Sequence, residues 1–174
     1  MKIVLCTFIL SLLCVTPFQA QETVEEKELK HGVALVVGFT HVPRTIEEGE
    51  TLNSQNLTTI GADYYYHFNQ KWKLGVVVDI ELGKYAVEFE GEELKRENAF
   101  ITGLVVGYHI LKRWSVYTGP GVEFERNKNI FILRASTGYE FEIGKNWAIA
   151  PVLSYDFKKE YGSYSFGIGV DKKF

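Results

Sequence analysis

The sequence predicts an all-β fold: an eight-stranded antiparallel up-and-down transmembrane β-barrel, preceded by a cleavable signal peptide. Three features predict it. Apolar and polar residues alternate with a period of two through eight segments of about ten residues, and no helical period replaces this pattern after residue 20. Short turns separate some segments, and long polar connections separate others. Strands of about ten residues can cross a bilayer at a tilt, as in a membrane barrel.

The first 20 of the 174 residues have the plan of a secretory signal peptide, with Lys2, an apolar run over 3–15 and Ala20 before the expected cut. Residues 21–30 are a polar, acidic lead-in, and 31–174 form one barrel domain. Both cysteines lie inside the signal peptide, so the mature chain has no disulfide. The net charge of −3 argues against nucleic acid as a partner, and no later segment has the roughly 18 consecutive apolar residues of a spanning helix.

Each predicted strand has one apolar face, because side chains alternate between the two faces of a strand. In chain order these faces are Val33, Leu35, Val37 and Phe39 over 31–42; Ile60, Ala62, Tyr64, Tyr66 and Phe68 over 57–68; Trp72, Leu74, Val76, Val78, Ile80 and Leu82 over 72–82; Phe100, Leu104, Val106, Tyr108 and Ile110 over 99–110; Val116, Val122 and Phe124 over 114–124; Phe131, Leu133, Ala135, Tyr139 and Phe141 over 130–141; Ile149, Leu153 and Tyr155 over 147–156; and Tyr164, Phe166, Ile168 and Val170 over 161–174.

The connections between the strands differ in length. The polar segments 43–56 and 83–97 are predicted to be long loops at one end of the barrel. Pro120 and Pro151 fall on the apolar faces of the fifth and seventh strands. Because proline has no backbone N–H, we expect a bulge or a locally missing hydrogen bond at each.

The three tryptophans share one context, since each opens a strand directly after a short turn. Aromatic residues also precede those turns, so aromatics gather at one end of the barrel. Tryptophan and tyrosine favour the membrane interface because the ring is apolar while its polar group still reaches water. The alternative is that they cap the core of a soluble barrel. The predicted girdle is Tyr66, Phe68, Trp72, Tyr108, Trp114, Tyr139, Phe141 and Trp147.

The faces opposite the apolar rows carry charged residues, which a membrane barrel encloses. An unpaired buried charge costs several kcal/mol, so these groups are expected to pair, with Arg134 as the hub and Glu123, Glu140 and Asp79 as candidate partners. We expect a network that plugs the lumen, in preference to a conducting pore. Its predicted members are Asp63, His67, Lys73, Asp79, Glu81, His109, Glu123, Arg134, Glu140 and Asp156.

Candidate chemistry is sparse. His41 and Ser54 near the loop end supply pieces of an acyl-transfer site, as in lipid A palmitoyltransferase barrels, but a triad is defined by geometry and not by composition. Neither the pair His31 and His41 on one strand nor the pair His67 and His109 in the lumen forms a dense metal-binding motif. We expect no catalytic, cofactor or metal site. The acidic loops would attract divalent cations or a surface partner, or would simply be solvated.

The mature chain resembles the small eight-stranded outer-membrane barrels of Gram-negative bacteria, of the outer-membrane protein X or outer-membrane protein A barrel type. The run Gly61–Tyr66 followed by Lys71 and Trp72 also resembles an uncharacterised Bacteroidetes-like family. The resemblance implies an outer-membrane location, contact with lipid and lipopolysaccharide, and a monomer. It also implies that the barrel-assembly machinery reads an alternating terminal signal made of Tyr164, Phe166, Ile168, Val170 and Phe174.

The function predicted from these features is a small outer-membrane barrel with a structural, adhesive or envelope-maintenance role. One alternative is a secreted, calycin-like soluble barrel whose apolar faces point inward around a lipophilic ligand. A third is a lipid-modifying barrel enzyme. The first two differ in one respect: in the membrane barrel the row with Leu74, Val76 and Val78 contacts lipid and Asp79 and Arg134 are enclosed.

Overall fold

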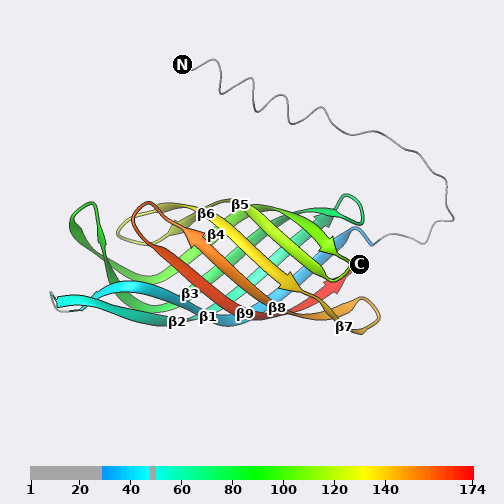
Figure 1. Ribbon diagram of the computed structural model, residues 1–174, viewed down its shortest axis with the longest axis horizontal. Coiled ribbons are helices and arrows are strands. Elements are labelled where there is room, and N and C mark those ends of the chain that lie inside the picture. The colour runs from blue at the N-terminus through cyan, green and yellow to red at the C-terminus, as the bar shows by residue number, and fades with distance from the viewer. Residues whose placement is uncertain (1–28, 48–49) are drawn as a thin grey trace, which may run out of the picture.

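The computed structural model describes residues 29–47 and 50–174. The predicted signal peptide, 1–20, and most of the lead-in, 21–30, lie outside the described residues. Strands form almost all of the described chain (Figure 1): β1 (His31–Glu47), β2 (Glu50–His67), β3 (Trp72–Phe89), β4 (Glu92–Leu111), β5 (Trp114–Phe124), β6 (Ile130–Tyr139), β7 (Phe141–Gly144), β8 (Trp147–Phe157) and β9 (Gly162–Lys173). Within these residues no helix is long and apolar enough to cross a membrane.

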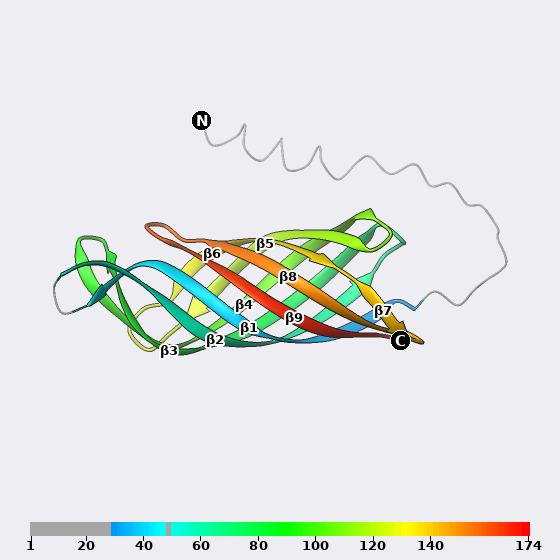
Figure 2. The ribbon, with the colours of Figure 1, turned by 60° about the horizontal axis from the view of Figure 1, so that its bottom comes forward.

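All neighbouring strands are antiparallel, and the sheet closes on itself. Consecutive strands pair from β1 to β6, β9 pairs with β8 and β1, and pairing between β6 and β8 completes the ring. The tilted strands wrap around one lumen (Figures 1 and 2). At the β1–β9 seam His31 N donates to Phe174 O at 3.1 Å, and Phe174 N donates to His31 O at 2.8 Å. The predicted closed up-and-down barrel is confirmed.

Segments β6 and β7 are two halves of one barrel strand, so the ring has eight strands. Gly138 pairs with Val152 and Phe141 pairs with Ile149 in the same register, but Pro151 has no partner on this side. The missing N–H of Pro151 interrupts the ladder there. Pro120 interrupts the β4–β5 ladder in the same way, because that pairing skips from Gly121 to Thr118 without a change of register.

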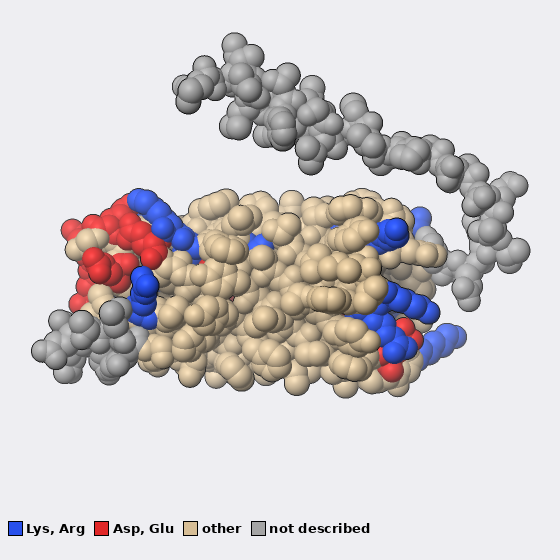
Figure 3. Space-filling view, in the orientation of Figure 1, with Lys and Arg blue, Asp and Glu red and all other residues tan. Residues whose placement is uncertain are grey.

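The apolar side chains point outward. Val76 is 44% exposed, whereas the next residue, Val77, is 5% exposed, and the same alternation runs along the other strands. On the face seen in Figure 3, the middle of the barrel consequently shows almost no charge. A soluble ligand-binding barrel would need the opposite orientation, because its apolar residues line the interior.

Two connections differ from the prediction. Residues 43–56 and 83–97 were expected to be loops, but the strands β1, β2, β3 and β4 extend through most of both, and Glu47 pairs with Glu50. Glu90 and Gly91, with φ of 56° and 80°, form the tip of the β3–β4 hairpin, and positive φ at both central residues is the type I′ geometry that suits twisted strands. We call this end the hairpin end, and the end with the turns at 68–71, 112–113 and 145–146 the short-turn end.

Candidate functional site in the barrel lumen

The centre of the lumen is organised around Arg134 on β6. Its Nε and Nη2 donate to the two carboxylate oxygens of Asp156 at 2.7 and 2.8 Å, and its Nη1 donates to Asp79 across the lumen. Asp156 is the direct cross-strand partner of Arg134, which explains the two parallel hydrogen bonds. All three side chains are almost fully enclosed.

The hub differs from the prediction in its partners. Asp79 was expected beside Arg134 and lies there, but Glu123 and Glu140 pair with other cations. On β5 the residue opposite Arg134 is Gly119, so Glu123 lies four residues farther toward the hairpin end. The lumen therefore contains separate layers of charge.

The layer toward the short-turn end is built on Glu140, the single residue between β6 and β7. Its two carboxylate oxygens lie 3.3 Å from Lys73 Nζ and 2.7 Å from Lys173 Nζ. The Lys73 ammonium also lies over the rings of Tyr65 and Tyr117, at 5.1 and 4.7 Å from their centroids. A cation over an aromatic face is attracted by the ring quadrupole, so Lys73 is held from three sides.

The two predicted lumen histidines lie at the short-turn mouth. The His67 and His109 rings stack with centroids 6.2 Å apart, and His109 Nδ1 is hydrogen-bonded to the Ser115 hydroxyl at 2.9 Å. Both are wall residues, and the hydrogen bond to Ser115 fixes the His109 ring. Among the described residues no group of three or more histidine, cysteine or acidic side chains is arranged to hold a metal ion.

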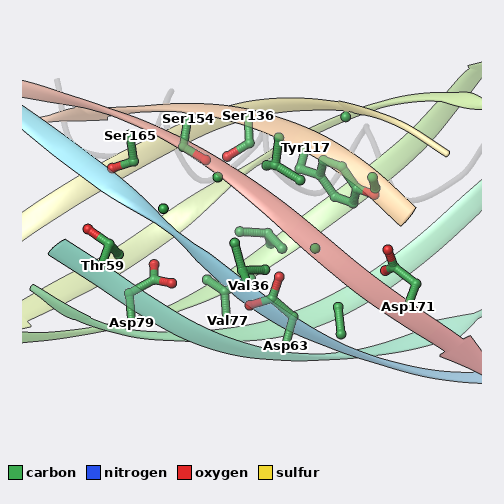
Figure 4. Close-up of a pocket in the computed structure, with 18 of the residues that line it drawn as sticks. Val36, Thr59, Asp63, Val77, Asp79, Tyr117, Ser136, Ser154, Ser165 and Asp171 are labelled. Atoms are coloured by element: carbon green, nitrogen blue, oxygen red, sulfur yellow. The ribbon is translucent and has the colours of Figure 1, made fainter. Parts of the chain in front are cut away.

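A cavity of about 60 Å³ lies between these layers (Figure 4). Asp63 and Asp171 line it, and Tyr65 donates a hydrogen bond to Asp63 at 2.9 Å. Serine side chains from β6, β8 and β9 line it as well. Because one water needs roughly 10–15 Å³ of such space and several polar partners, the cavity has room for a few hydrogen-bonded waters.

The layer toward the hairpin end was only partly foreseen. Glu123 is fully buried and pairs with Arg96, whose Nε donates to it at 2.9 Å, and with Lys158, whose Nζ lies 2.6 Å away. Arg96 also pairs with Glu125 at 3.3 Å. Arg96 and Lys158 were not predicted to face the lumen, because both lie in segments expected to be loops or turns. Glu81 was predicted here, and both of its buried carboxylate oxygens lack a hydrogen-bond partner in the described part of the chain.

Apolar side chains close the mouth above this layer. Seven of them, from four strands and a turn, make one buried cluster, and Leu94 on a fifth strand packs against it. The seven are Val42, Leu57, Tyr85, Val87, Phe89, Ile130 and Tyr161. Here the inward positions of the barrel change from charged to apolar. The buried cluster lies across the lumen axis at the hairpin end, so the extended strands of the hairpins fold over the opening.

Glu90 fastens the tip of the β3–β4 hairpin to two neighbouring connections. Its carboxylate accepts hydrogen bonds from Lys128 at 2.7 Å and from Lys159 at 2.8 Å. These hydrogen bonds, of which the one from Lys128 has the larger effect, lower the pKa of Glu90 to about 2. The hydrogen bond between Lys159 and Glu90 also raises the pKa of Lys159. The Lys128 ammonium also lies 4.2 Å from the centroid of the Phe89 ring. We call these contacts the Glu90 clasp.

The predicted girdle residues all lie on the outer wall at the short-turn end. The Trp72 and Tyr108 rings pack with centroids 4.7 Å apart, and Trp114 Nε1 donates to the Thr137 hydroxyl at 2.6 Å. The full set contains Phe68, Trp72, Trp114, Tyr139, Phe141 and Trp147, which are exposed, and Tyr66 and Tyr108, which are half-buried.

The predicted terminal signal lies on β9 and directly after it. Tyr164, Phe166, Ile168 and Val170 face outward, and the Phe174 ring stacks on His31 with centroids 5.8 Å apart. Lys172, which breaks the apolar alternation, places its ammonium 4.3 Å from the centroid of the Trp147 ring.

The candidate catalytic pieces at the hairpin end do not assemble into a triad. The His41 ring faces outward, stacks on Tyr164 and is hydrogen-bonded through Nδ1 to the Asn56 side chain at 2.8 Å. Ser54 is exposed on the neighbouring strand, two residues from Asn56. The imidazole is therefore held by an amide and an aromatic ring, where a triad needs an acid and a nucleophile.

Several solved structures have a similar fold, and the following three match over almost their whole length. The N-terminal β-barrel domain of Pseudomonas aeruginosa OprF matches with a TM-score of 0.55 and 13% identity over 82% of this chain and 97% of that one. Ail of Yersinia pestis, in complex with the heparin analogue sucrose octasulfate, matches with a TM-score of 0.49 and 17% identity over 83% of this chain and 99% of that one. Neisserial surface protein A matches with a TM-score of 0.46 and 14% identity over 81% of this chain and 97% of that one. No curated protein sequence matches significantly.

The model of the outer membrane protein beta-barrel domain family matches residues 8–174. This match covers the whole closed barrel, with its outward apolar rows, its enclosed charges and the aromatic side chains on the outer wall at the short-turn end. The location of the protein is therefore the outer membrane, where the outer wall contacts lipid. The chain belongs to the outer membrane protein beta-barrel domain family.

Proposed function

We propose that this protein is a closed, non-conducting and non-enzymatic scaffold that holds its two extended hairpins, β1–β2 and β3–β4, at the cell surface. Its role is structural, adhesive or in envelope maintenance. The proposal includes export through residues 1–20, delivery by the barrel-assembly machinery through the β9 signal, and a monomeric state in contact with lipid and lipopolysaccharide.

The observation that carries the proposal is the closure at the hairpin end. Buried apolar side chains lie over a layer in which Glu123 is held by Arg96 and Lys158, and over a second layer in which Arg134 bridges two carboxylates. An ion would have to displace both layers, and breaking a buried ion pair costs about 3–5 kcal/mol. This cost supports a plugged lumen.

The hairpins support a role at the surface. The β3–β4 hairpin continues past the lipid-facing row, which ends near Leu82 and Phe100, and it is held by the Glu90 clasp. Its outer part is acidic and exposed, with Glu88, Glu92 and Glu93 around the tip and Glu97 nearer the base. A fixed, charged surface element loses little entropy when it binds a partner.

Planar-bilayer recording tests the closed lumen, with a general porin reconstituted in parallel. We expect no current steps from this barrel, and stable open channels from the wild-type protein would refute the proposal.

The surface role is tested in cells that carry either the full barrel or a variant in which residues 84–97 are replaced by a two-residue turn. We expect the shortened barrel to reach the outer membrane and to lose attachment or detergent resistance. If cells with the full barrel and cells with the shortened barrel attach equally well and are equally resistant to detergent, the β3–β4 hairpin has no part in the function.

A further inference from the structure

The short-turn end carries a ring of cations that the lumen network does not use. The ring is formed by Lys30, Lys71, Lys112, Arg113, Lys145 and Lys172, which we call the basic collar. Figure 3 shows lysine and arginine side chains gathered at this end with few acidic ones among them. Arg113 lies 3.9 Å from Glu142, and in the described part of the chain this is the collar's one ion pair with a side chain.

The cations of the hairpin end have a different environment. Lys84 pairs with Glu97, Lys95 with Glu93, and Lys128 and Lys159 with Glu90. Most of that positive charge is neutralised within the protein. The charge of the collar is largely uncompensated, so it is available to an anionic partner.

The position of the collar identifies that partner. Lys71 and Arg113 directly precede Trp72 and Trp114, which open the lipid-facing rows of β3 and β5. Tryptophan at such a position lies at the depth of the lipid headgroups. The collar cations therefore lie at the headgroup level or just outside it, where long basic side chains extend along the interface.

The third turn repeats the arrangement. Lys145 precedes Trp147 by two residues, and the Lys172 ammonium lies over the Trp147 ring at 4.3 Å. Each short turn thus combines a basic side chain with an indole that faces lipid. Three such units around one rim are complementary to a ring of anionic headgroups.

We propose that the basic collar binds the phosphate headgroups of anionic phospholipids, and that it concentrates these lipids around the short-turn end of the barrel. Outer-membrane barrels have their short turns on the periplasmic side, so these lipids belong to the inner leaflet of the outer membrane. A basic residue near an anionic surface gains a Coulomb attraction that salt weakens. The collar would act as a selective site for lipid class, beyond general contact with hydrocarbon.

The chain contains a built-in reporter for this site, because all three of its tryptophans lie beside the collar. The barrel is refolded into phosphatidylcholine vesicles that contain dibrominated phosphatidylglycerol or dibrominated phosphatidylcholine at equal mole fraction. Bromine quenches only the tryptophans that it contacts. We expect stronger quenching by the anionic lipid. The association constant of the anionic lipid relative to phosphatidylcholine should be about 5, which corresponds to the attraction of about one basic residue. High salt should reduce this preference.

The test variant is K71Q/K112Q/R113Q/K145Q, and the matched control is R44Q/K84Q/K95Q/R126Q at the hairpin end. Heat-modifiable gel migration establishes that each variant is folded. We expect the test variant to lose the preference and the control to keep it. Equal quenching by both lipids in the wild type, or a preference that survives in the test variant, overturns the proposal.

The acidic lead-in is the competing occupant of the collar, because it carries Glu22, Glu25, Glu26 and Glu28. A chain that begins at residue 29 distinguishes the two occupants. If the preference for anionic lipid appears only in that shortened chain, the lead-in occupies the collar and the proposal is wrong. If both chains show the same preference, the lipid site is supported.

Discussion

Replacing Arg134 by methionine tests the enclosed charge network most sharply. The substitution keeps an unbranched side chain and removes the guanidinium that bridges Asp156 and Asp79. Both carboxylates are deeply buried, at 1% and 9% exposure, so bulk water does not solvate them when the guanidinium is lost. The variant Arg134→Met consequently contains two unpaired acids in the lumen.

The expected loss in the free energy of unfolding follows from that geometry. Removing one partner of a buried ion pair costs about 3–5 kcal/mol, and here one cation serves two acids. With a dependence on urea of about 2 kcal/mol per molar, the unfolding midpoint should fall by about 1.5–2.5 M. Neutral side chains at both acids remove the unpaired charges, so Arg134→Met combined with Asp79→Asn and Asp156→Asn should recover most of the loss.

Urea unfolding of the refolded barrel in lipid vesicles, followed by tryptophan fluorescence, measures these values. The exposed Arg126→Gln is the control and should change the free energy of unfolding by less than about 0.5 kcal/mol. A loss below about 1 kcal/mol for Arg134→Met, or a triple variant no more stable than the single one, would contradict the enclosed network.

Three further predictions concern the seam, the clasp and the terminal signal. A Cβ at Gly38 would meet the Phe166 backbone across the β1–β9 seam, so Gly38→Ala should lower the folded fraction on heat-modifiable gels, whereas Gly144→Ala, where the space is open, should not. The pKa of Glu90 is lowered from 4.5 to about 2. The stabilisation that the clasp gives the folded state is therefore complete above about pH 4.5 and is lost as the pH falls toward 2. An NMR titration of this carboxyl with a midpoint near 4.5 would show that the clasp does not form. Phe174→Ala removes the ring stacked on His31 and should slow assembly into the outer membrane in cells, and unchanged assembly kinetics would separate this residue from the signal.

The parts of the structure that the sequence predicts are those set by local alternation. Side chains alternate strictly along a strand, so Val76 and Val77 could be assigned to opposite faces without knowledge of any neighbouring strand. The short turns were predictable for the same reason, because each tryptophan after a turn begins a strand in the structure. The strand starts at Trp72, Trp114 and Trp147 agree with the prediction.

The ion pairs could not be predicted from one strand at a time. Which cation meets Glu123 depends on the register of several strands and on where the chain folds over the mouth. Arg96 is buried only because the β3–β4 hairpin remains paired beyond the lipid-facing row. Lys158 is buried because the turn after β8 directs it inward.

The extended hairpins were missed because their outer residues are polar on the exposed face. The inward positions carry the strand signal: Tyr85, Val87 and Phe89 alternate with small or polar residues up to the Glu90–Gly91 turn. Glycine at the second position of a two-residue turn between alternating segments is a hairpin feature, and here Gly91 forms the tip with Glu90.

The orientation of the wall is the claim on which the account depends, and a nitroxide scan of residues 74–80 in refolded vesicles measures it directly. Collisions with oxygen report lipid, and collisions with a water-soluble nickel chelate report aqueous surroundings. We predict that oxygen accessibility peaks at Leu74, Val76, Val78 and Ile80 and falls at the three positions between them. Peaks at Gly75, Val77 and Asp79 would place the charged face against the lipid and contradict the account.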